Sequence, residues 1–183
     1  MSLVACWDQP QLHQSCARSH QTLKYSSPLL PSAPPRSPQV GLSGPTIFHQ
    51  LIDAANSVAA AAQCSQATQK YFVLLIITDG VINDMAETTL ALAKASGLPL
   101  SLIIIGVGAD AFAQMKSLDS DGSLLSSESG KHKCLRDIVQ FVPMRNFVGK
   151  PDAALAAEVL AEVPSQVLQY MAMRGIMPNA RRA

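Results

Sequence analysis

YFVLLIITDGVINDM, residues 71–85, contains an unbroken apolar run that ends in a single carboxylate, Asp79, followed by a glycine. An apolar run of this length without alternation is typical of a strand covered on both faces, as in a parallel sheet. We therefore predict a β-strand that ends at Thr78. Asp79 then has four candidate roles: a turn residue, with Asn83 or Asp84 capping the next helix, a metal ligand, part of a phosphate loop or a catalytic acid.

The segments on either side of this strand alternate between helical and strand-like patterns. TIFHQLIDAANSVAAAA, residues 46–62, carries apolar side chains at helical spacing, and Thr46 stands at its start as the expected cap. MAETTLALAKASG, residues 85–97, is amphipathic and predicts a second helix. LPLSLIIIGVG, residues 98–108, predicts a second buried strand.

The alternation continues toward the end of the chain. We predict a short helix over residues 110–118, a third strand within residues 135–147, and a helix over residues 152–175 that bends or breaks at Pro164. Alternating strands and helices imply an α/β fold, a doubly wound, mostly parallel sheet with right-handed crossovers. Such folds bind ligands beyond the carboxyl ends of their strands, where Asp79 is expected.

Composition restricts the function classes. The chain has 183 residues, 48% of them hydrophobic and 15% charged, which suits one domain with a substantial core. The formal net charge of +1 argues against both nucleic acid and an anionic membrane as the main partner. Aromatic residues make up only 5%, so few side chains are available to stack on bases.

The four cysteines form no C-x-x-C pair, and their irregular spacing argues against a disulfide framework. We therefore expect reduced thiols and an intracellular protein. The first ten residues, MSLVACWDQP, lack the basic start and apolar stretch of a secretory signal. The longest apolar runs are too short to span a bilayer as helices.

Residues 1–40 differ from the remainder because they hold half of the twelve prolines. Proline removes a backbone donor and breaks helices, so we predict a disordered, proline-rich arm. Within this arm, QTLKYSS, residues 21–27, is the candidate for an added strand, although it lacks the apolar density of a central strand.

GVGADA, residues 106–111, matches the G-x-G-x-x-A loop of dinucleotide-binding folds. The acidic residue expected about 20 positions later, at the end of the next strand, is missing. We favour a packing role, in which Gly106 and Gly108 let a turn pass close to a neighbouring loop. A nucleotide-binding enzyme that uses this loop remains the alternative.

Other motifs for catalysis or metal binding are incomplete. DSDGS, residues 119–123, begins like a calcium loop, but Leu124 and Gly130 occupy the positions that require glycine and glutamate. The Cys and His residues between positions 6 and 20 fit no common zinc spacing. No G-x-S-x-G nucleophile motif occurs. We therefore predict that the protein is not an enzyme.

Four blocks in order resemble the C-terminal half of copines: YFVLLIITDGVINDM, LPLSLIIIGVG, LRDIVQFVPMRNF and VLAEVPSQVLQYM. The similarity runs over residues 41–178, leaving residues 179–183 as a tail. Copines resemble von Willebrand factor A domains in this region, and they carry two calcium- and phospholipid-binding C2 domains ahead of it. The resemblance implies a von Willebrand A-like (Rossmann-like) sheet that is incomplete, because its opening strands are replaced or lost.

The resemblance also bears on Asp79. Von Willebrand A domains can carry a metal-ion-dependent adhesion site made of D-x-[ST]-x-S, a threonine in a later loop and an aspartate after the fourth strand. In this chain the threonine corresponds to Thr46 and the aspartate to Asp79, while the first motif is not found. We therefore expect a remnant site that binds Mg²⁺ or Mn²⁺ weakly, and no C2-type Ca²⁺ site.

The resemblance implies a protein-interaction module whose partners are intracellular proteins and not nucleic acid. Membrane contact would be indirect, through the C2 domains of the family, and the expected location is cytoplasmic or peripheral to the plasma membrane. Besides the nucleotide-binding enzyme, a non-functional truncated isoform is the second alternative, because an incomplete sheet exposes a central strand edge.

Overall fold

The computed structural model describes residues 3–6, 45–119, 124–126, 130 and 132–179. The chain divides into two units, residues 8–44 and the rest, and every described residue belongs to the second unit. The strand candidate at residues 21–27, most of the predicted arm, most of the calcium-like loop and His13, Cys16 and His20 of the zinc candidate lie outside the described residues.

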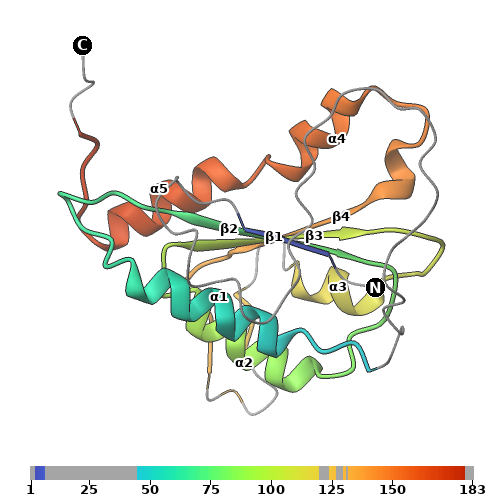
Figure 1. Ribbon diagram of the computed structural model, residues 1–183, viewed down its shortest axis with the longest axis horizontal. Helices are drawn as coiled ribbons and strands as arrows, with labels where there is room; N and C mark the ends of the chain where they lie inside the picture. Colours follow the sequence, from blue (N-terminus) through green and yellow to red (C-terminus); the bar gives the residue numbers. More distant parts are fainter. Residues whose placement is uncertain (1–2, 7–44, 120–123, 127–129, 131, 180–183) are drawn as a thin grey trace, which may run out of the picture. The chain divides into compact units, whose positions relative to one another are not determined.

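The described part of the chain forms a sheet in the order β1-β2-β3-β4 (Figure 1). Its strands are β1 (Leu3–Cys6), β2 (Phe72–Thr78), β3 (Leu100–Gly106) and β4 (Val139–Pro143). β2, β3 and β4 run parallel, whereas β1 pairs antiparallel with β2. The three strands predicted from apolar runs are thus confirmed, including the one that ends at Thr78.

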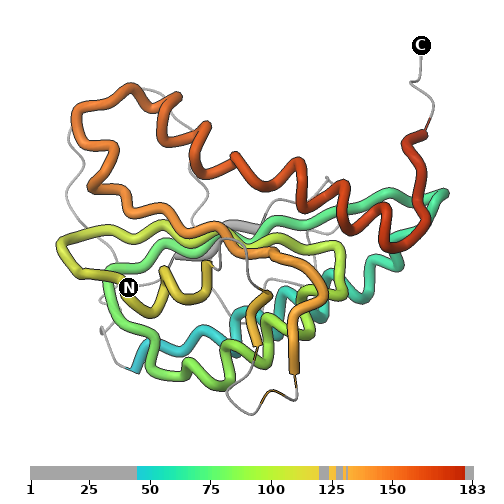
Figure 2. The backbone as a smooth tube through the Cα atoms, turned by 180° about the vertical axis from the view of Figure 1, so that it is seen from behind, coloured from blue at the N-terminus to red at the C-terminus, as the bar shows by residue number. Residues whose placement is uncertain are grey.

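Helices cover both faces of the sheet (Figures 1 and 2). They are α1 (His49–Ala61), α2 (Met85–Ala95), α3 (Ala113–Leu118), the 3₁₀ helix η1 (Met144–Phe147), α4 (Asp152–Val159) and α5 (Val163–Met173). α1, α2 and α3 lie on one face, and α4 and α5 lie on the other. The predicted doubly wound α/β fold is confirmed. No described helix is both long enough and apolar enough to cross a membrane.

The predicted break near Pro164 is confirmed. α4 ends at Val159, and α5 begins at Val163 with Pro164 in its first turn. Proline is tolerated there because the first backbone N–H groups of a helix have no intrahelical acceptor. The C-terminal segment therefore forms two successive helices on one side of the sheet (Figure 1).

β3 and β2 differ in how completely they are covered. Six of the seven residues of β3 are buried, as expected for a strand with neighbours on both sides and helices on both faces. In β2 buried residues alternate with half-buried ones, so the face toward α1 and α2 is covered and the opposite face is covered only in part. We expected both faces of β2 to be covered; one face is buried, and the other is half-buried.

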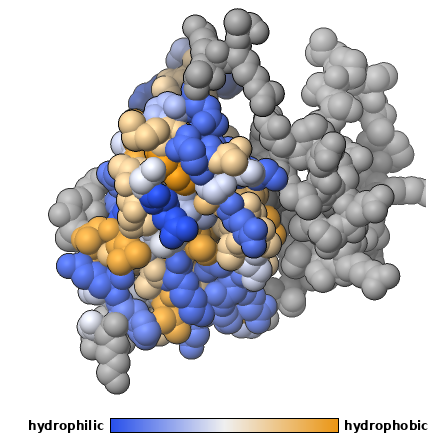
Figure 3. Space-filling model, turned by 90° about the vertical axis from the view of Figure 1, so that its left-hand side faces the viewer, coloured by the Kyte–Doolittle hydropathy of each residue, from blue (hydrophilic) through white to orange (hydrophobic). Residues whose placement is uncertain are grey.

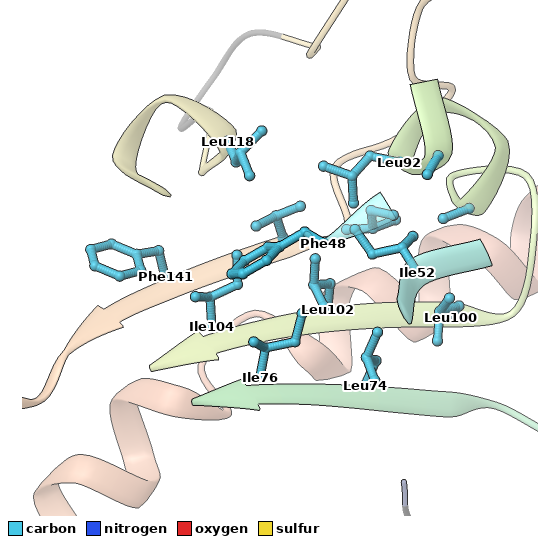
Figure 4. Close-up of a cluster of buried hydrophobic side chains, with 14 of the residues drawn as sticks. Phe48, Ile52, Leu74, Ile76, Leu92, Leu100, Leu102, Ile104, Leu118 and Phe141 are labelled. Atoms are coloured by element: carbon cyan, nitrogen blue, oxygen red, sulfur yellow. The ribbon is translucent and has the colours of Figure 1, made fainter. Parts of the chain in front are cut away.

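The main core lies between the sheet and α1, α2 and α3 (Figure 4). Its largest fully buried side chains include Phe48, Ile52, Leu74, Ile76, Leu92, Leu100, Leu102, Ile104 and Leu118. Figure 4 shows the leucines and isoleucines of β2 and β3 pointing toward the side chains of α1 and α2. Burial of such side chains, at about 25 cal/mol per Å² of apolar area, is the main stabilising term.

A second, more polar core lies under α5. Cys64, Tyr170 and Ile176 are buried there, with Tyr71 packed against them. Arg136 is only 5% exposed and lies 5.7 Å and 5.5 Å from the ring centres of Tyr71 and Tyr170. This core therefore contains a cationic side chain held between two aromatic rings.

The guanidinium of Arg136 connects several backbone segments. It donates hydrogen bonds to the carbonyl oxygens of Leu98 at 2.6 Å, Leu100 at 2.8 Å and Gln166 at 3.3 Å, and to the hydroxyl of Tyr71 at 3.0 Å. Leu98 and Leu100 lie at or just before the start of β3, and Tyr71 directly precedes β2, whereas Gln166 belongs to α5. Arg136 therefore joins α5 to the sheet.

Large apolar side chains also remain exposed outside the core. Figure 3 shows hydrophobic patches interrupted by hydrophilic ones on the side where α5 lies. Exposed residues of this kind on α1, α5 and the segment after α5 are Val58, Leu168, Met173 and Met177. Isolated apolar side chains are common on protein surfaces and need no partner.

β1 is the element that the sequence patterns did not predict. We expected residues 1–40 to lack regular structure, whereas Leu3–Cys6 form a strand along the edge of β2. The side of β2 that faces away from β3 is therefore occupied by an antiparallel strand of four residues.

Candidate functional site

The carboxyl ends of the three parallel strands meet at one edge of the sheet. Thr78, Gly106 and Pro143 are register partners across β2, β3 and β4, and the N–H of Val107 donates to the carbonyl of Thr78 at 2.8 Å. The loops that follow these strands, residues 79–84, 107–112 and 144–150, together with Thr46, are called the strand-end rim below. Ligand sites of doubly wound folds lie at this kind of edge.

Thr46 lies beside the loop that begins with Asp79. The N–H of Thr46 donates to Oδ1 of Asn83 at 2.8 Å, and the N–H of Asn83 donates back to the carbonyl of Thr46 at 3.1 Å. A Cβ placed on Gly80 would lie 4.0 Å from Oγ1 of Thr46. Asp79 is exposed and Thr46 is half-buried. The two residues predicted as a metal site are thus on the same side of the sheet, in loops that are hydrogen-bonded to each other.

The prediction that Thr46 caps the first helix is wrong. α1 begins at His49, and Phe48 occupies the N-cap position without a side-chain hydrogen bond of its own. The N–H of Phe48 donates to both carboxylate oxygens of Asp84 at 3.0 Å, and the N–H of His49 donates to Oδ2 at 2.7 Å. Asp84 therefore caps α1 from the start of α2, and its negative charge lies at the positive end of the α1 dipole.

Asp84 has further partners. Nδ1 of His49 lies 2.7 Å from Oδ2 of Asp84, and the hydroxyl of Thr88 donates to the same oxygen at 3.2 Å. Burial acts to raise the pKa of Asp84, but hydrogen bonds from His49, Phe48 and Thr88 outweigh it and hold the pKa below its ordinary value. The carboxylate is 6% exposed, so it is a structural anion that holds α1, α2 and the strand-end rim together.

The residues at the rim fit a divalent cation poorly. Asp79 supplies one carboxylate and Thr46 one hydroxyl, whereas the carboxylate of Asp84 is occupied by the start of α1. Mg²⁺ requires six oxygen ligands in octahedral geometry, so most of its ligands here would be water. In the part of the chain that the structure describes, no group of three or more His, Cys, Asp or Glu side chains could hold a metal ion.

The loop after β3 shows why glycine is needed at position 106. A Cβ on Gly106 would lie 3.0 Å from ring atoms of Phe112 and Phe141, which is closer than side chains normally approach. The two rings pack against each other with centres 5.5 Å apart. Gly108 has a φ of +97°, a conformation that favours glycine. The space over Gly106 is filled by aromatic side chains, which supports the packing role over phosphate binding.

Phe112 has an unusual backbone conformation. Its φ is +52°, in the left-handed region, although it is a buried aromatic residue at the start of α3. Arg145 lies over its ring at 5.8 Å and donates to the carbonyl oxygens of Ala109 at 3.2 Å and Asp110 at 2.6 Å. The strained conformation is therefore held by contacts with the loop after β4.

The rim also exposes apolar side chains. Val81, Met144 and Val148 are 52%, 47% and 82% exposed, and they lie in the loops after β2 and β4. Asp79, Arg145 and Lys150 provide charges in the same loops and are also exposed. Exposed apolar groups surrounded by charges are typical of protein contact surfaces.

These features define the class of the protein: an α/β domain of the von Willebrand factor A type, with a parallel sheet, helices on both faces and loops gathered at the carboxyl ends of the strands. The sheet is incomplete, because β1 is antiparallel and short. A sequence model of the copine family matches residues 33–179, which are 147 of the 183 residues. The chain belongs to the copine family.

Proposed function

We propose that this chain is a protein-interaction module that binds an intracellular partner protein through the strand-end rim. The observation that supports it best is that the rim places exposed Val81, Met144 and Val148 beside the charges of Asp79 and Arg145. Backbone hydrogen bonds and the contacts of Arg145 fix the loops, so little conformational entropy would be lost on binding.

Lipid binding is proposed to reside elsewhere in the family. The resemblance places calcium-dependent phospholipid binding in C2 domains, and the residues of the strand-end rim include no cluster of carboxylates that would bind calcium tightly. Membrane contact of the described residues would therefore be indirect, and the chain would act by binding protein and not as an enzyme.

Substitution at the rim tests the proposal. Val148→Asp places a charge on a side chain that is 82% exposed, so the fold should tolerate it. Affinity capture from cells, followed by quantitative mass spectrometry, should show about tenfold less of the bound partner, because a charge at position 148 would replace an apolar contact of the proposed interface.

Leu168→Asp is the matched control, because Leu168 is 66% exposed on α5 and lies outside the rim. Capture by this variant should equal that of the wild-type chain. If both variants lose the same proteins to the same extent, or if neither loses any, the partner does not bind at the rim.

Metal binding is expected to be weak. A site with only two protein ligands should have a dissociation constant of about 10 mM or more for Mg²⁺. At roughly 5 mM Mg²⁺ the melting temperature of the protein should therefore rise by less than about 1 °C. Differential scanning fluorimetry with Mg²⁺ and Mn²⁺ measures this, with Asp79→Asn as the control. A rise of several degrees that Asp79→Asn abolishes would show a tighter site. A melt without a cooperative transition would instead support the non-functional isoform.

A further inference from the structure

The two outer strands of the parallel part of the sheet, β4 and β2, are protected to different degrees. On the outer edge of β4, the N–H of Val139 donates to Oδ1 of Asp137 and the N–H of Phe141 donates to Oδ2 of Asp119, both at 3.1 Å. Pro143 ends this strand and has no N–H. Side-chain acceptors and proline keep an edge from pairing with another strand, so β4 is closed to further pairing.

The other edge of the parallel strands is the side of β2 that faces away from β3. The N–H of Phe72 and the carbonyl of Thr78 form hydrogen bonds toward β3. Because backbone groups alternate along a strand, the N–H and C=O groups of Val73, Leu75 and Ile77 point to the opposite side. These groups belong to an apolar, largely buried strand, so leaving them without partners would be costly.

β1 supplies partners for part of this edge. In the register of β1 and β2, Leu3 lies opposite Ile77 and Ala5 lies opposite Leu75. Because the backbone groups of Leu75 and Ile77 point toward β1, these two pairs are the hydrogen-bonded ones. Val73 lies beyond the last residue of β1, and no strand among the described residues pairs with it on this side. The edge of β2 is thus longer than the strand that occupies it.

The connection between β1 and the rest of the unit is long. β1 ends at Cys6 and α1 begins at His49, so residues 7–48 connect the two elements. The effective concentration of a tethered segment falls as the connection lengthens, so a connection of this many residues gives β1 an effective concentration at β2 of about a millimolar or less. A second copy of the chain carries the same LVAC segment and the same edge, and it can form identical backbone hydrogen bonds.

We propose that the edge of β2 is a strand-binding site, and that Leu3–Cys6 of a second copy occupies it in a reciprocal strand-exchanged dimer. Exchange replaces each intramolecular β1–β2 pairing with the same pairing between copies, so its free energy depends chiefly on protein concentration. This inference concerns the sheet edge and does not rest on binding of a partner at the strand-end rim.

A disulfide across one hydrogen-bonded pair tests the exchange. The full-length chain carries Leu3→Cys and Ile77→Cys, with Cys6→Ala and Cys16→Ala to reduce other pairings. Cys64 and Cys134 are buried and are kept. It is oxidised at concentrations from about 1 µM to about 1 mM, which bracket the expected effective concentration, and analysed by non-reducing electrophoresis. The cross-link should lie within single chains at the lowest concentration, and the dimeric share should rise at least about tenfold toward the highest.

Two proline variants of this cysteine pair distinguish strand pairing from random collision. Ala5→Pro removes an N–H that points to β2 and should abolish both cross-links, whereas Val4→Pro removes one that points away and should preserve them. A cross-link confined to single chains at every concentration would overturn the proposal. Equal behaviour of the two proline variants, or no cross-link at all, would overturn it too.

Discussion

Asp84→Ala should lower the free energy of unfolding by about 3 kcal/mol, as measured by urea denaturation. The substitution removes the acceptor for the N–H groups of Phe48 and His49 at the start of α1, and also for the hydroxyl of Thr88. Since Phe48 is buried, water cannot fully replace the lost acceptor. The loss should exceed that of an ordinary helix cap, because Asp84 also connects two helices.

The effect should depend on pH with a definite sign. The pKa of Asp84 lies below its ordinary value of 3.8, so its ionised form stabilises the folded state. That contribution is complete above the unfolded pKa of about 4 and is lost as the pH falls through the lower folded pKa. The difference between wild-type and Asp84→Ala proteins should therefore be constant near neutral pH and shrink below about pH 4.

Asp53→Ala is the matched control for Asp84→Ala. Asp53 lies on α1 and its carboxylate is 3.7 Å from Nζ of Lys94, but both side chains are substantially exposed. Exposed ion pairs contribute about 0.5 kcal/mol or less, so this variant should unfold nearly as the wild type does. Equal destabilisation by the two substitutions would contradict the capping role of Asp84.

Local sequence patterns predicted those parts of the fold in which residue type depends directly on burial or on helix geometry. β2 and β3 are apolar because helices cover them, and the helices carry apolar residues at intervals that match one face. The break before α5 follows from Pro164, whose effect on a helix is local. Each of these signals lies within the segment it describes, so one sequence was sufficient.

The cap of α1 could not be predicted in the same way. Thr46 stands close to the start of the helix and is a residue type that often caps, whereas the carboxylate that caps α1 comes from Asp84, 35 positions after His49. The local pattern allowed Asp84 only as a cap for α2, and it does occupy the N-cap position of that helix. Its side chain bonds to the backbone of α1, because tertiary contacts override local preference.

The sequence predicted some residues of the candidate site and missed others. The apolar run placed Asp79 at a strand end, and the family resemblance brought Thr46 to the same rim, where the structure has both. No local sequence pattern predicts the contacts of Arg145 at the rim or the strained backbone of Phe112. β1 was missed for a related reason, because four residues without a periodic pattern become a strand only beside the edge of β2.

Arg136→Met should be the most destabilising substitution outside the main core, lowering the free energy of unfolding by about 4 kcal/mol. Methionine fills a similar volume but donates no hydrogen bonds. The carbonyl groups of Leu98 and Leu100 would lose a charged donor at 2.6 Å and 2.8 Å, in a place where Arg136 itself is only 5% exposed. Urea denaturation followed by circular dichroism measures the loss.

The loss should be concentrated where α5 meets the sheet, because Arg136 also bonds the carbonyl of Gln166 and lies against Tyr170. Hydrogen exchange should therefore become faster in α5 than in α1, since α1 packs on the opposite face. Arg174→Met is the control: it removes a charge from an exposed position directly after α5 and should change stability by less than about 0.5 kcal/mol. If Arg136→Met and Arg174→Met have equal effects, the guanidinium of Arg136 does not hold α5 on the sheet, and apolar contacts of Tyr170 and Ile176 must do so.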